Sequence, residues 1–456
     1  MLFNSLEFII LFLPLVVIVY YQLNKHLGKK SSILWLVFVS LIFYGYWKLA
    51  YLPILICSIF FNYFFGKYLS QRKSKNLLRV GVGANLLLLG YFKYTNFFIE
   101  NLNLSLGLNI SAQNIVLPLA ISFFTFQQIA FLVDSYYGKL KDYNFGNYAL
   151  FVSFFPQLIA GPIVHHGEMM PQFAKAFKGI DFEKTAKGLF IFSIGLFKKV
   201  MIADNLSPFV KEGFDVSTSL TFIDAWFTSL AYTFQLYFDF SGYTDMAWGA
   251  ALLLGIQLPQ NFESPYKAIS IRDFWRRWHM TLSRFLRDYL YIPLGGNQKG
   301  FSRTLINLFI TFLIGGIWHG AAWTFIAWGA LHGLALVVER LLSKAGFSIN
   351  KWVSIPATFL FVNMAWIFFR ALSFSDAWKV LNGMFSSDFS DPQLADSKTA
   401  IFWIIIAAIL SFFGKNSNQY LKDFKADTMN LMIAFTLMLI AILNLNKLSE
   451  FIYFQF

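Results

Sequence analysis

The chain has 456 residues, of which 57% are hydrophobic, 20% aromatic and only 13% charged. Soluble domains carry about 25% charged residues, so this composition excludes a soluble globular protein. Its aromatic content excludes a disordered chain. Lysine and arginine outnumber aspartate and glutamate by 37 to 24, which gives a net charge of +13. In a membrane protein, such an excess of basic residues usually lies in the cytoplasmic loops. No nucleic-acid-binding motif is present, and nucleic acid is not expected as a partner.

The apolar runs are continuous rather than alternating, which favours membrane-spanning helices over a β-barrel. The first run, Phe8–Tyr20, lacks the basic segment and cleavage site of a signal peptide, so we expect a retained span. Several runs are shorter than the roughly 20 residues that a full crossing needs. We therefore expect an all-α polytopic protein in a single domain, with ten to thirteen crossings plus re-entrant and interfacial helices. The further runs lie at 33–47, 51–66, 80–92, 115–133, 149–163, 188–203, 222–238, 243–256, 304–317, 321–342, 352–369, 400–413 and 429–443.

Basic charge alternates between the early loops. The loops after the first, third and fifth spans are basic, whereas those between them carry only Lys48 and Lys93. Because basic loops stay in the cytoplasm, the N-terminus is predicted to lie outside. The basic loops contain Lys25, Lys29 and Lys30, then Lys67, Arg72, Lys73, Lys75 and Arg79, then Lys139 and Lys141.

Metal and cofactor motifs are scarce. Cys57 is the only cysteine, which excludes an intramolecular disulfide and a cysteine-based zinc site. The run His165–Glu168 (HHGE) offers possible metal ligands, but adjacent histidines in a loop are weak evidence and no HExxH motif occurs. No metal site and no bound cofactor are predicted. No P-loop and no GxSxG motif occur, so neither ATP-driven chemistry nor an α/β-hydrolase nucleophile is indicated.

The segment Ser270–Ile292 (SIRDFWRRWHMTLSRFLRDYLYI) is the most charged part of the chain. If it is one helix, its aromatic and aliphatic residues share an arc of about 120°, and arginines fill the other side. This pattern predicts an interfacial amphipathic helix, with His279 at the border of its two faces. The basic face could simply anchor the helix at the headgroups, or it could also attract an anionic ligand such as a coenzyme phosphate. It contains Arg276, Arg277, Arg284 and Arg287.

His319 lies in an apolar run, in the sequence GGIWHG. Ionisable residues inside membrane segments are costly and usually functional. An imidazole has a pKa near 6.5, so a buried one is neutral and can accept a proton. Catalysis by His319 and a purely structural role both stay open on these grounds. On one straight helix, His332 would lie roughly 20 Å away, which favours a structural or supporting role for it.

Asp239 and Asp245, in YFDFSGYTDMAWG, are carboxylates at or inside the membrane. They could orient a histidine or the arginines, or they could bond to neighbouring helices. The residues alone therefore leave an acyl-transfer enzyme and a transporter as alternatives.

Several motifs resemble the membrane-bound O-acyltransferase family, and in particular its alginate-acetylating bacterial branch. The resemblance spans nearly the whole chain and is densest between about 230 and 335. It implies a ring of spans around a central funnel or tunnel, and a multi-pass protein of the bacterial inner membrane. The motifs are FFPQLIAGPI (154–163), FDFSGYTDMAWG (238–249), the long Arg/Trp-rich run 258–297 that ends in PLGGN, GGIWHGAAWTFIAWGALHG (315–333) and the terminal FIYFQF.

The resemblance also implies a mechanism. By this resemblance, the essential histidine of the family corresponds to His319, and the second functional position of the family corresponds to His279. His319 would act as general base on an acceptor hydroxyl that attacks an acyl thioester, with acetyl-CoA as the expected donor. The acceptor would be a polysaccharide, and an extracytoplasmic SGNH-type acetyltransferase is the expected protein partner. Supporting or substrate-binding roles are expected for Asp239, Asp245, Trp318, Arg276, Arg277 and Asn297.

Two other functions compete with this one. The chain could be a conduit that passes acetyl groups across the membrane to a separate transferase, or a scaffold that only recruits that partner. A conduit needs a polar path but no base, so it should tolerate His319→Gln. A scaffold should tolerate every histidine substitution.

Overall fold

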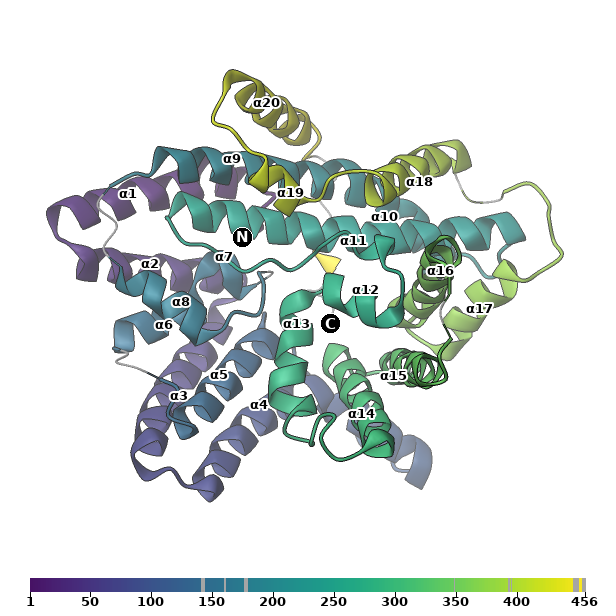
Figure 1. Cartoon of the computed structure of the whole chain (residues 1–456), viewed down its shortest axis with the longest axis horizontal. Coiled ribbons are helices and arrows are strands. Elements are labelled where there is room, and N and C mark those ends of the chain that lie inside the picture. Colours follow the sequence, from purple (N-terminus) through teal and green to yellow (C-terminus); the bar gives the residue numbers. More distant parts are fainter. Residues whose placement is uncertain are drawn as a thin grey trace. The chain divides into compact units, whose positions relative to one another are not determined.

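The computed structural model describes residues 1–140, 144–159, 161–175, 179–347, 349–392, 394, 396–445 and 451–452. Every regular element in these ranges is a helix, which confirms the all-α class (Figure 1). The terminal motif FIYFQF lies outside the described residues beyond Ile452.

Five described segments are long and apolar enough to cross a membrane, and this confirms the polytopic character of the chain. Two shorter apolar helices are α18 (Ser397–Phe412) and α20 (Thr428–Leu443). The expected total of ten to thirteen crossings stays a prediction. The five segments are Glu7–His26, Leu49–Arg72, Phe301–His319, Trp323–Lys344 and Lys351–Arg370.

The helices belong to two compact units. The first comprises Met1–Ile194, Tyr243–Pro259 and Lys425–Met438, and the second comprises Gly195–Gly242, Gln260–Phe424 and Leu439–Phe456. Helices α9 (Phe182–Phe197), α11 (Phe222–Leu253) and α20 run from one unit into the other. The remaining helices of the first unit are α1 (Leu13–His26), α2 (Lys29–Gly45), α3 (Leu52–Arg72), α4 (Lys75–Leu106), α5 (Ile121–Tyr136), α6 (Phe145–Ser153), α7 (Phe155–Leu158) and α8 (His166–Ala174). Those of the second are α10 (Asp204–Lys211), α12 (Ile271–Arg277), α13 (Met280–Leu286), α14 (Phe301–His319), α15 (Trp323–Lys344), α16 (Lys351–Arg370), α17 (Phe374–Met384), α18 (Ser397–Phe412) and α19 (Ser417–Lys422).

Helix α11 corrects the prediction of two separate spans at 222–238 and 243–256. The structure has one helix of 32 residues through Ser241 and Gly242. A methyl group added to Gly242 would lie 2.8 Å from the carbonyl oxygen of Gly195. Gly242 therefore permits close packing against a neighbouring backbone and does not interrupt the helix.

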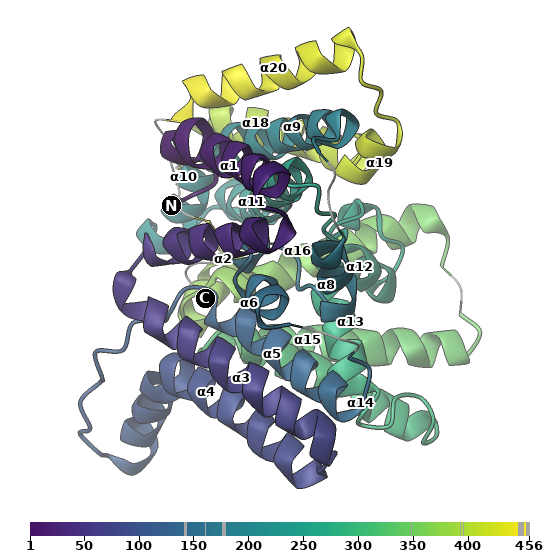
Figure 2. The same cartoon turned by 90° about the vertical axis from the view of Figure 1, so that its left-hand side faces the viewer.

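In the first unit, α3, α4 and α5 lie side by side (Figure 2). Buried amides bind across these helices: Asn85 Nδ2 donates to Asn62 Oδ1 at 2.7 Å, and Gln128 Nε2 donates to Ser58 Oγ at 2.8 Å. Such interhelical hydrogen bonds satisfy polar groups that lipid cannot solvate. They fix the position of α5, which carries Asp134 near its end.

In the second unit, α14 and α15 form a tightly packed hairpin (Figure 1). A methyl group added to Gly316 would lie 2.9 Å from the Cα atom of Gly329, and one added to Gly329 would lie 2.6 Å from the carbonyl oxygen of Phe312. The glycines therefore let the two backbones touch. Because the chain reverses directly after His319, this residue sits at the end of α14.

The structure also corrects the prediction of one amphipathic helix over Ser270–Ile292. The segment is divided into α12, α13 and a π-helical turn at Arg287–Tyr291, and Figure 1 shows α12 and α13 as separate helices. The break falls at Trp278 and His279, and His279 has a left-handed backbone with φ +43°. Only a few per cent of non-glycine residues adopt this conformation, although histidine is enriched among them. His279 is fully buried rather than on the border of a helix face.

Candidate active site

His319, the last residue of α14, is buried with 4% of its surface exposed. Three aromatic rings surround its imidazole, each roughly edge-on. The ring centroids lie 4.9 Å away for Trp318, 5.0 Å for Trp328 and 5.1 Å for Phe369. These residues come from α14, α15 and α16, so the helix packing of the second unit builds the environment of His319.

The ring of Trp328 belongs to a tryptophan cluster formed by Trp275, Trp278, Trp328 and Trp366. Trp328 stacks on Trp366 with centroids 5.7 Å apart, and Trp366 contacts Trp278 at 5.0 Å. Trp278 immediately precedes His279 in the chain. The tryptophan cluster therefore connects the surroundings of His319 with those of His279.

His332 lies much closer to His319 than a straight helix would allow. Both imidazole centroids lie 5.0 Å from the Trp328 centroid, so they are separated by at most twice that distance, 10.0 Å. The estimate of roughly 20 Å was wrong because the chain breaks between α14 and α15. His332 is fully buried, and its Nδ1 accepts a hydrogen bond from Trp275 Nε1 at 3.2 Å. It therefore holds α12 against α15, in accord with a supporting role.

The same hydrogen bond defines the tautomer of His332. Because Nδ1 accepts, the neutral ring carries its proton on Nε2. Among the described residues, no partner receives this Nε2–H, nor the indole N–H groups of Trp328 and Trp366. Unsatisfied buried donors are rare and require an explanation. Trp328 contacts the His319 ring, and His332 and Trp366 both contact Trp328, so the three donors gather in the same part of the second unit.

His279 is held by Asn261, which the sequence analysis had not singled out. Asn261 Oδ1 lies 3.2 Å from His279 Nδ1 and also accepts from the Thr281 backbone N–H at 3.2 Å and from its hydroxyl at 2.9 Å. The backbone donor identifies this atom as the amide oxygen, so the neutral His279 ring must donate from Nδ1. Its Nε2 then carries the lone pair. Burial lowers the pKa of His279 to about 3, so the ring is neutral at physiological pH.

Replacing Asn261 by alanine is expected to lower acyl transfer roughly tenfold or more, because it removes the acceptor that fixes the His279 ring and the start of α13. Initial rates in membrane vesicles would measure this loss. Gln260→Ala is the matched control, since the neighbouring Gln260 side chain bonds only to the Phe262 carbonyl among the residues that the structure describes. Equal activity in the two variants would contradict the positioning role of Asn261.

The predicted basic face is partly neutralised by its own neighbours. Arg277 pairs with Asp273 at 3.0 Å, and Arg287 pairs with Asp288 at 2.7 Å. Arg276 is exposed and forms no ion pair within the described residues. Of the two arginines expected to support the site, Arg276 is therefore the more available for an anionic ligand. Asn297 is also exposed, in the turn after the π-helical segment.

Asp239 lies in a buried ion cluster rather than beside a histidine. Lys199 Nζ lies 2.5 Å from Asp239 Oδ1 and 2.8 Å from Asp204 Oδ1, and the Ile452 backbone N–H donates to Asp239 Oδ2 at 3.0 Å. The structure thus supports the alternative in which Asp239 bonds to neighbouring helices. Lys198 and Lys199 are adjacent lysines that follow an apolar run. Nothing in the sequence indicated that Lys199 is buried. Asp245 is buried on the part of α11 that belongs to the first unit.

Comparisons with known proteins point to one family. A family model for membrane-bound O-acyltransferases matches residues 41–375. A peptidoglycan O-acetyltransferase of Helicobacter pylori is 51% identical over 421 residues, covering 84% of this chain and 80% of the relative. A Pseudomonas putida protein described as "Probable alginate O-acetylase AlgI" is 40% identical over 93% of this chain and 88% of its own length. A teichoic acid D-alanyltransferase of Bacillus subtilis is 28% identical over 57% of the chain and 70% of its own length.

Proposed function

Because the chain belongs to the membrane-bound O-acyltransferase family, we propose that it O-acetylates a polysaccharide of the bacterial cell envelope. Its family and the names of its relatives support an O-acyltransferase activity for this chain. The acetyl group is proposed because relatives at 51% and 40% identity are both named for O-acetylation. The structural observation that carries the proposal is the burial of His319 among aromatic rings and unsatisfied N–H donors.

Peptidoglycan is the acceptor that the comparisons favour. The relative named for peptidoglycan has 51% identity with this chain, against 40% for the Pseudomonas putida relative named for alginate. The resemblance of the motifs had favoured an alginate-like polymer, which stays the second candidate. Both acceptors offer sugar hydroxyl groups, so the chemistry at His319 is the same for each.

The proposed reaction is general-base acyl transfer. The neutral imidazole of His319 takes the proton from the acceptor hydroxyl while the hydroxyl oxygen attacks the carbonyl carbon of an acetyl thioester. The new C–O bond forms, the C–S bond breaks, and the proton returns from His319 to the departing thiolate. A positioned base contributes typically about 10²- to 10⁴-fold to such a rate. His279 is proposed to hold the acceptor or the donor through its Nε2 lone pair, which is able to accept a hydrogen bond from a substrate.

The donor is proposed to be acetyl-CoA, bound as a substrate. Arg276 supports this choice, because an exposed guanidinium without an ion pair among the described residues can bind phosphate. The chain is proposed to lie in the inner membrane with its N-terminus outside. An extracytoplasmic SGNH-type acetyltransferase is proposed as its protein partner in acetylation of the envelope.

A deletion strain complemented with the wild-type chain tests the acceptor. Mass spectrometry of released muropeptides measures peptidoglycan O-acetylation, and the acetyl content of the exported polysaccharide is measured in the same cultures. We expect the deletion to remove acetyl groups from muropeptides and complementation to restore them. Loss confined to the exported polysaccharide would identify the alginate-like acceptor instead. No change in either polymer would contradict the proposed function.

A further inference from the structure

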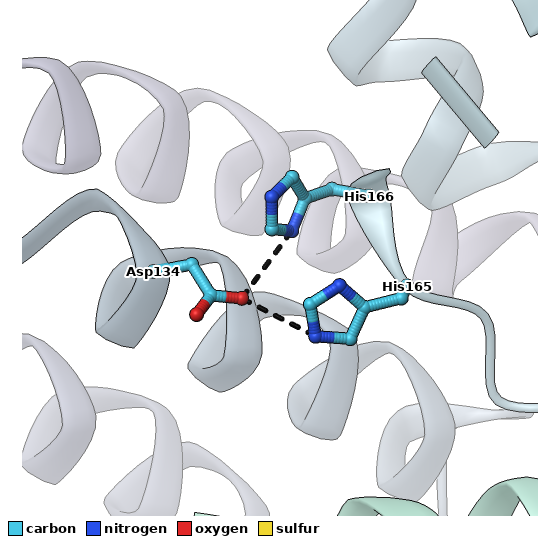
Figure 3. Close-up of side chains that lie close together, drawn as sticks. All are labelled: Asp134, His165 and His166. Atoms are coloured by element: carbon cyan, nitrogen blue, oxygen red, sulfur yellow. Dashed lines mark ion pairs between the residues drawn. The ribbon is translucent and has the colours of Figure 1, made fainter. Parts of the chain in front are cut away.

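Asp134, His165 and His166 converge in the first unit, although Asp134 and His165 lie 31 positions apart in the chain (Figure 3). Asp134 lies two residues before the end of α5, His165 is the N-cap of α8, and His166 is its first residue. The two imidazoles lie on the same side of the Asp134 carboxylate, and the dashed lines in Figure 3 meet at one of its oxygens. One potential ligand atom of each residue lies within 4.8 Å of the other two.

The distances match metal coordination better than hydrogen bonding. Asp134 Oδ2 lies 3.3 Å from His165 Nε2 and 3.5 Å from His166 Nδ1, beyond the usual hydrogen-bond range of about 2.7–3.2 Å. Around a tetrahedral Zn²⁺ with bonds of about 2.0–2.1 Å, neighbouring ligand atoms are roughly 3.3–3.4 Å apart. The two distances from the carboxylate oxygen to the imidazole nitrogens therefore already match the spacing that one shared ion would impose.

The chemical state of these residues also suits a metal ion. The Asp134 side chain is fully buried, and His166 is 7% exposed, with no hydrogen-bond partner for its Nδ1 among the described residues. An imidazole nitrogen and a carboxylate oxygen are ordinary zinc ligands, so a bound ion would give the buried His166 Nδ1 a partner. The His165 side chain is 30% exposed, which leaves the cluster open to solvent on one side.

We propose that Asp134, His165 and His166 bind a divalent transition-metal ion, and that Zn²⁺ is the ion that this ligand set favours. Two imidazoles and one carboxylate are usual zinc ligands, and a water molecule would complete four-coordination. The ion would tie the end of α5 to the start of α8. This inference is independent of the proposed acyl transfer, because none of its residues belongs to the candidate active site.

Lys139 is the neighbouring group that competes with a metal. Its ammonium lies 3.2 Å from Asp134 Oδ1, whereas both histidines face Oδ2. The Lys139 side chain is 64% exposed, so it can withdraw when a cation binds. Lys139→Met is therefore expected to bind Zn²⁺ at least as tightly as the wild type.

The test uses the full chain purified in detergent with an affinity tag that contains no histidine. After stripping with a chelator, Zn²⁺ is titrated calorimetrically, Co²⁺ binding is followed by the visible bands of tetrahedral cobalt, and thermal unfolding is recorded with and without Zn²⁺. Mg²⁺ is the control ion. We expect one equivalent of Zn²⁺, a tetrahedral cobalt spectrum and a higher unfolding temperature with Zn²⁺.

Asp134→Asn, His165→Ala and His166→Gln are each expected to weaken binding at least roughly tenfold. His26→Ala, at an exposed histidine that ends α1, is the matched control and should bind like the wild type. If the substitutions at the buried Asp134 and His166 prevent folding, His165→Ala and Lys139→Met still test the site, because both of these side chains are at least partly exposed. Absence of binding in the wild type, unchanged binding in His165→Ala, or weaker binding in Lys139→Met would overturn the proposal.

Discussion

Replacing His319 by alanine is expected to lower the initial rate of acetyl transfer by about 10²- to 10⁴-fold, the usual contribution of a positioned general base. The aromatic rings that contact the imidazole on α14, α15 and α16 cannot themselves accept the proton of a hydroxyl group. Membrane vesicles supplied with isotope-labelled acetyl-CoA and an acceptor saccharide measure the rate. Protein abundance is matched by immunoblot.

His319→Gln distinguishes loss of the base from loss of packing. Glutamine fills most of the volume of histidine and stays polar, but it does not accept a proton near neutral pH. The general-base mechanism therefore predicts inactivity for both substitutions and wild-type thermal unfolding for the glutamine variant. An active His319→Gln protein would instead support the conduit, and activity in both variants would support the scaffold. His26→Ala controls for histidine substitution at an exposed position.

Replacing Lys199 by methionine is expected to destabilise the second unit by about 3–5 kcal/mol, as is typical when a buried ion pair loses one partner. Lys199 is fully buried, and the change would leave the Asp204 and Asp239 carboxylates buried without their cation. The expected result is a low yield of folded protein and a lower unfolding temperature in detergent.

Two further variants isolate the electrostatic cause. Combining Lys199→Met with Asp204→Asn and Asp239→Asn removes all three charges and is expected to restore much of the lost stability. Lys415→Met breaks an exposed ion pair with Asp423 and is expected to leave thermal unfolding unchanged, since exposed pairs contribute little. Equal unfolding temperatures for Lys199→Met and Lys415→Met would contradict the buried cluster.

The sequence predicted the features that depend on composition and local motif. Apolar runs identified the helices, and the family resemblance singled out His319, which the structure places at a buried helix end. The apolar face predicted for Ser270–Ile292 is also largely correct. Its aromatic and aliphatic residues are buried, except for Tyr289, which is partly exposed. The expected roles of these residues in catalysis stay predictions.

The rest depended on contacts between distant residues. A helical wheel cannot reveal the break at His279, because a seven-residue helix on either side keeps much the same periodicity as one long helix. The break is stabilised by Asn261, 18 residues earlier in the chain. Lys199 is recognisable as part of a buried ion cluster only when its two aspartate partners are known to be its neighbours in space. The cluster of His165 and His166 is likewise recognisable only when Asp134 is known to lie beside them. The sequence run had instead suggested Glu168 as the acidic companion of the histidines.

The tryptophan cluster gives the protein an optical signal of its own. Trp328 and Trp366 are nearly parallel, with 17° between their planes, and the imidazoles of His319 and His332 are steeply inclined to the Trp328 ring. Stacked indoles couple their electronic transitions, and an imidazolium beside an indole quenches its fluorescence. Near-ultraviolet circular dichroism and intrinsic emission can therefore report events around His319 without any label. Trp328 contacts the His319 imidazole and also belongs to the tryptophan cluster, so protonation of His319 becomes spectroscopically visible through the cluster.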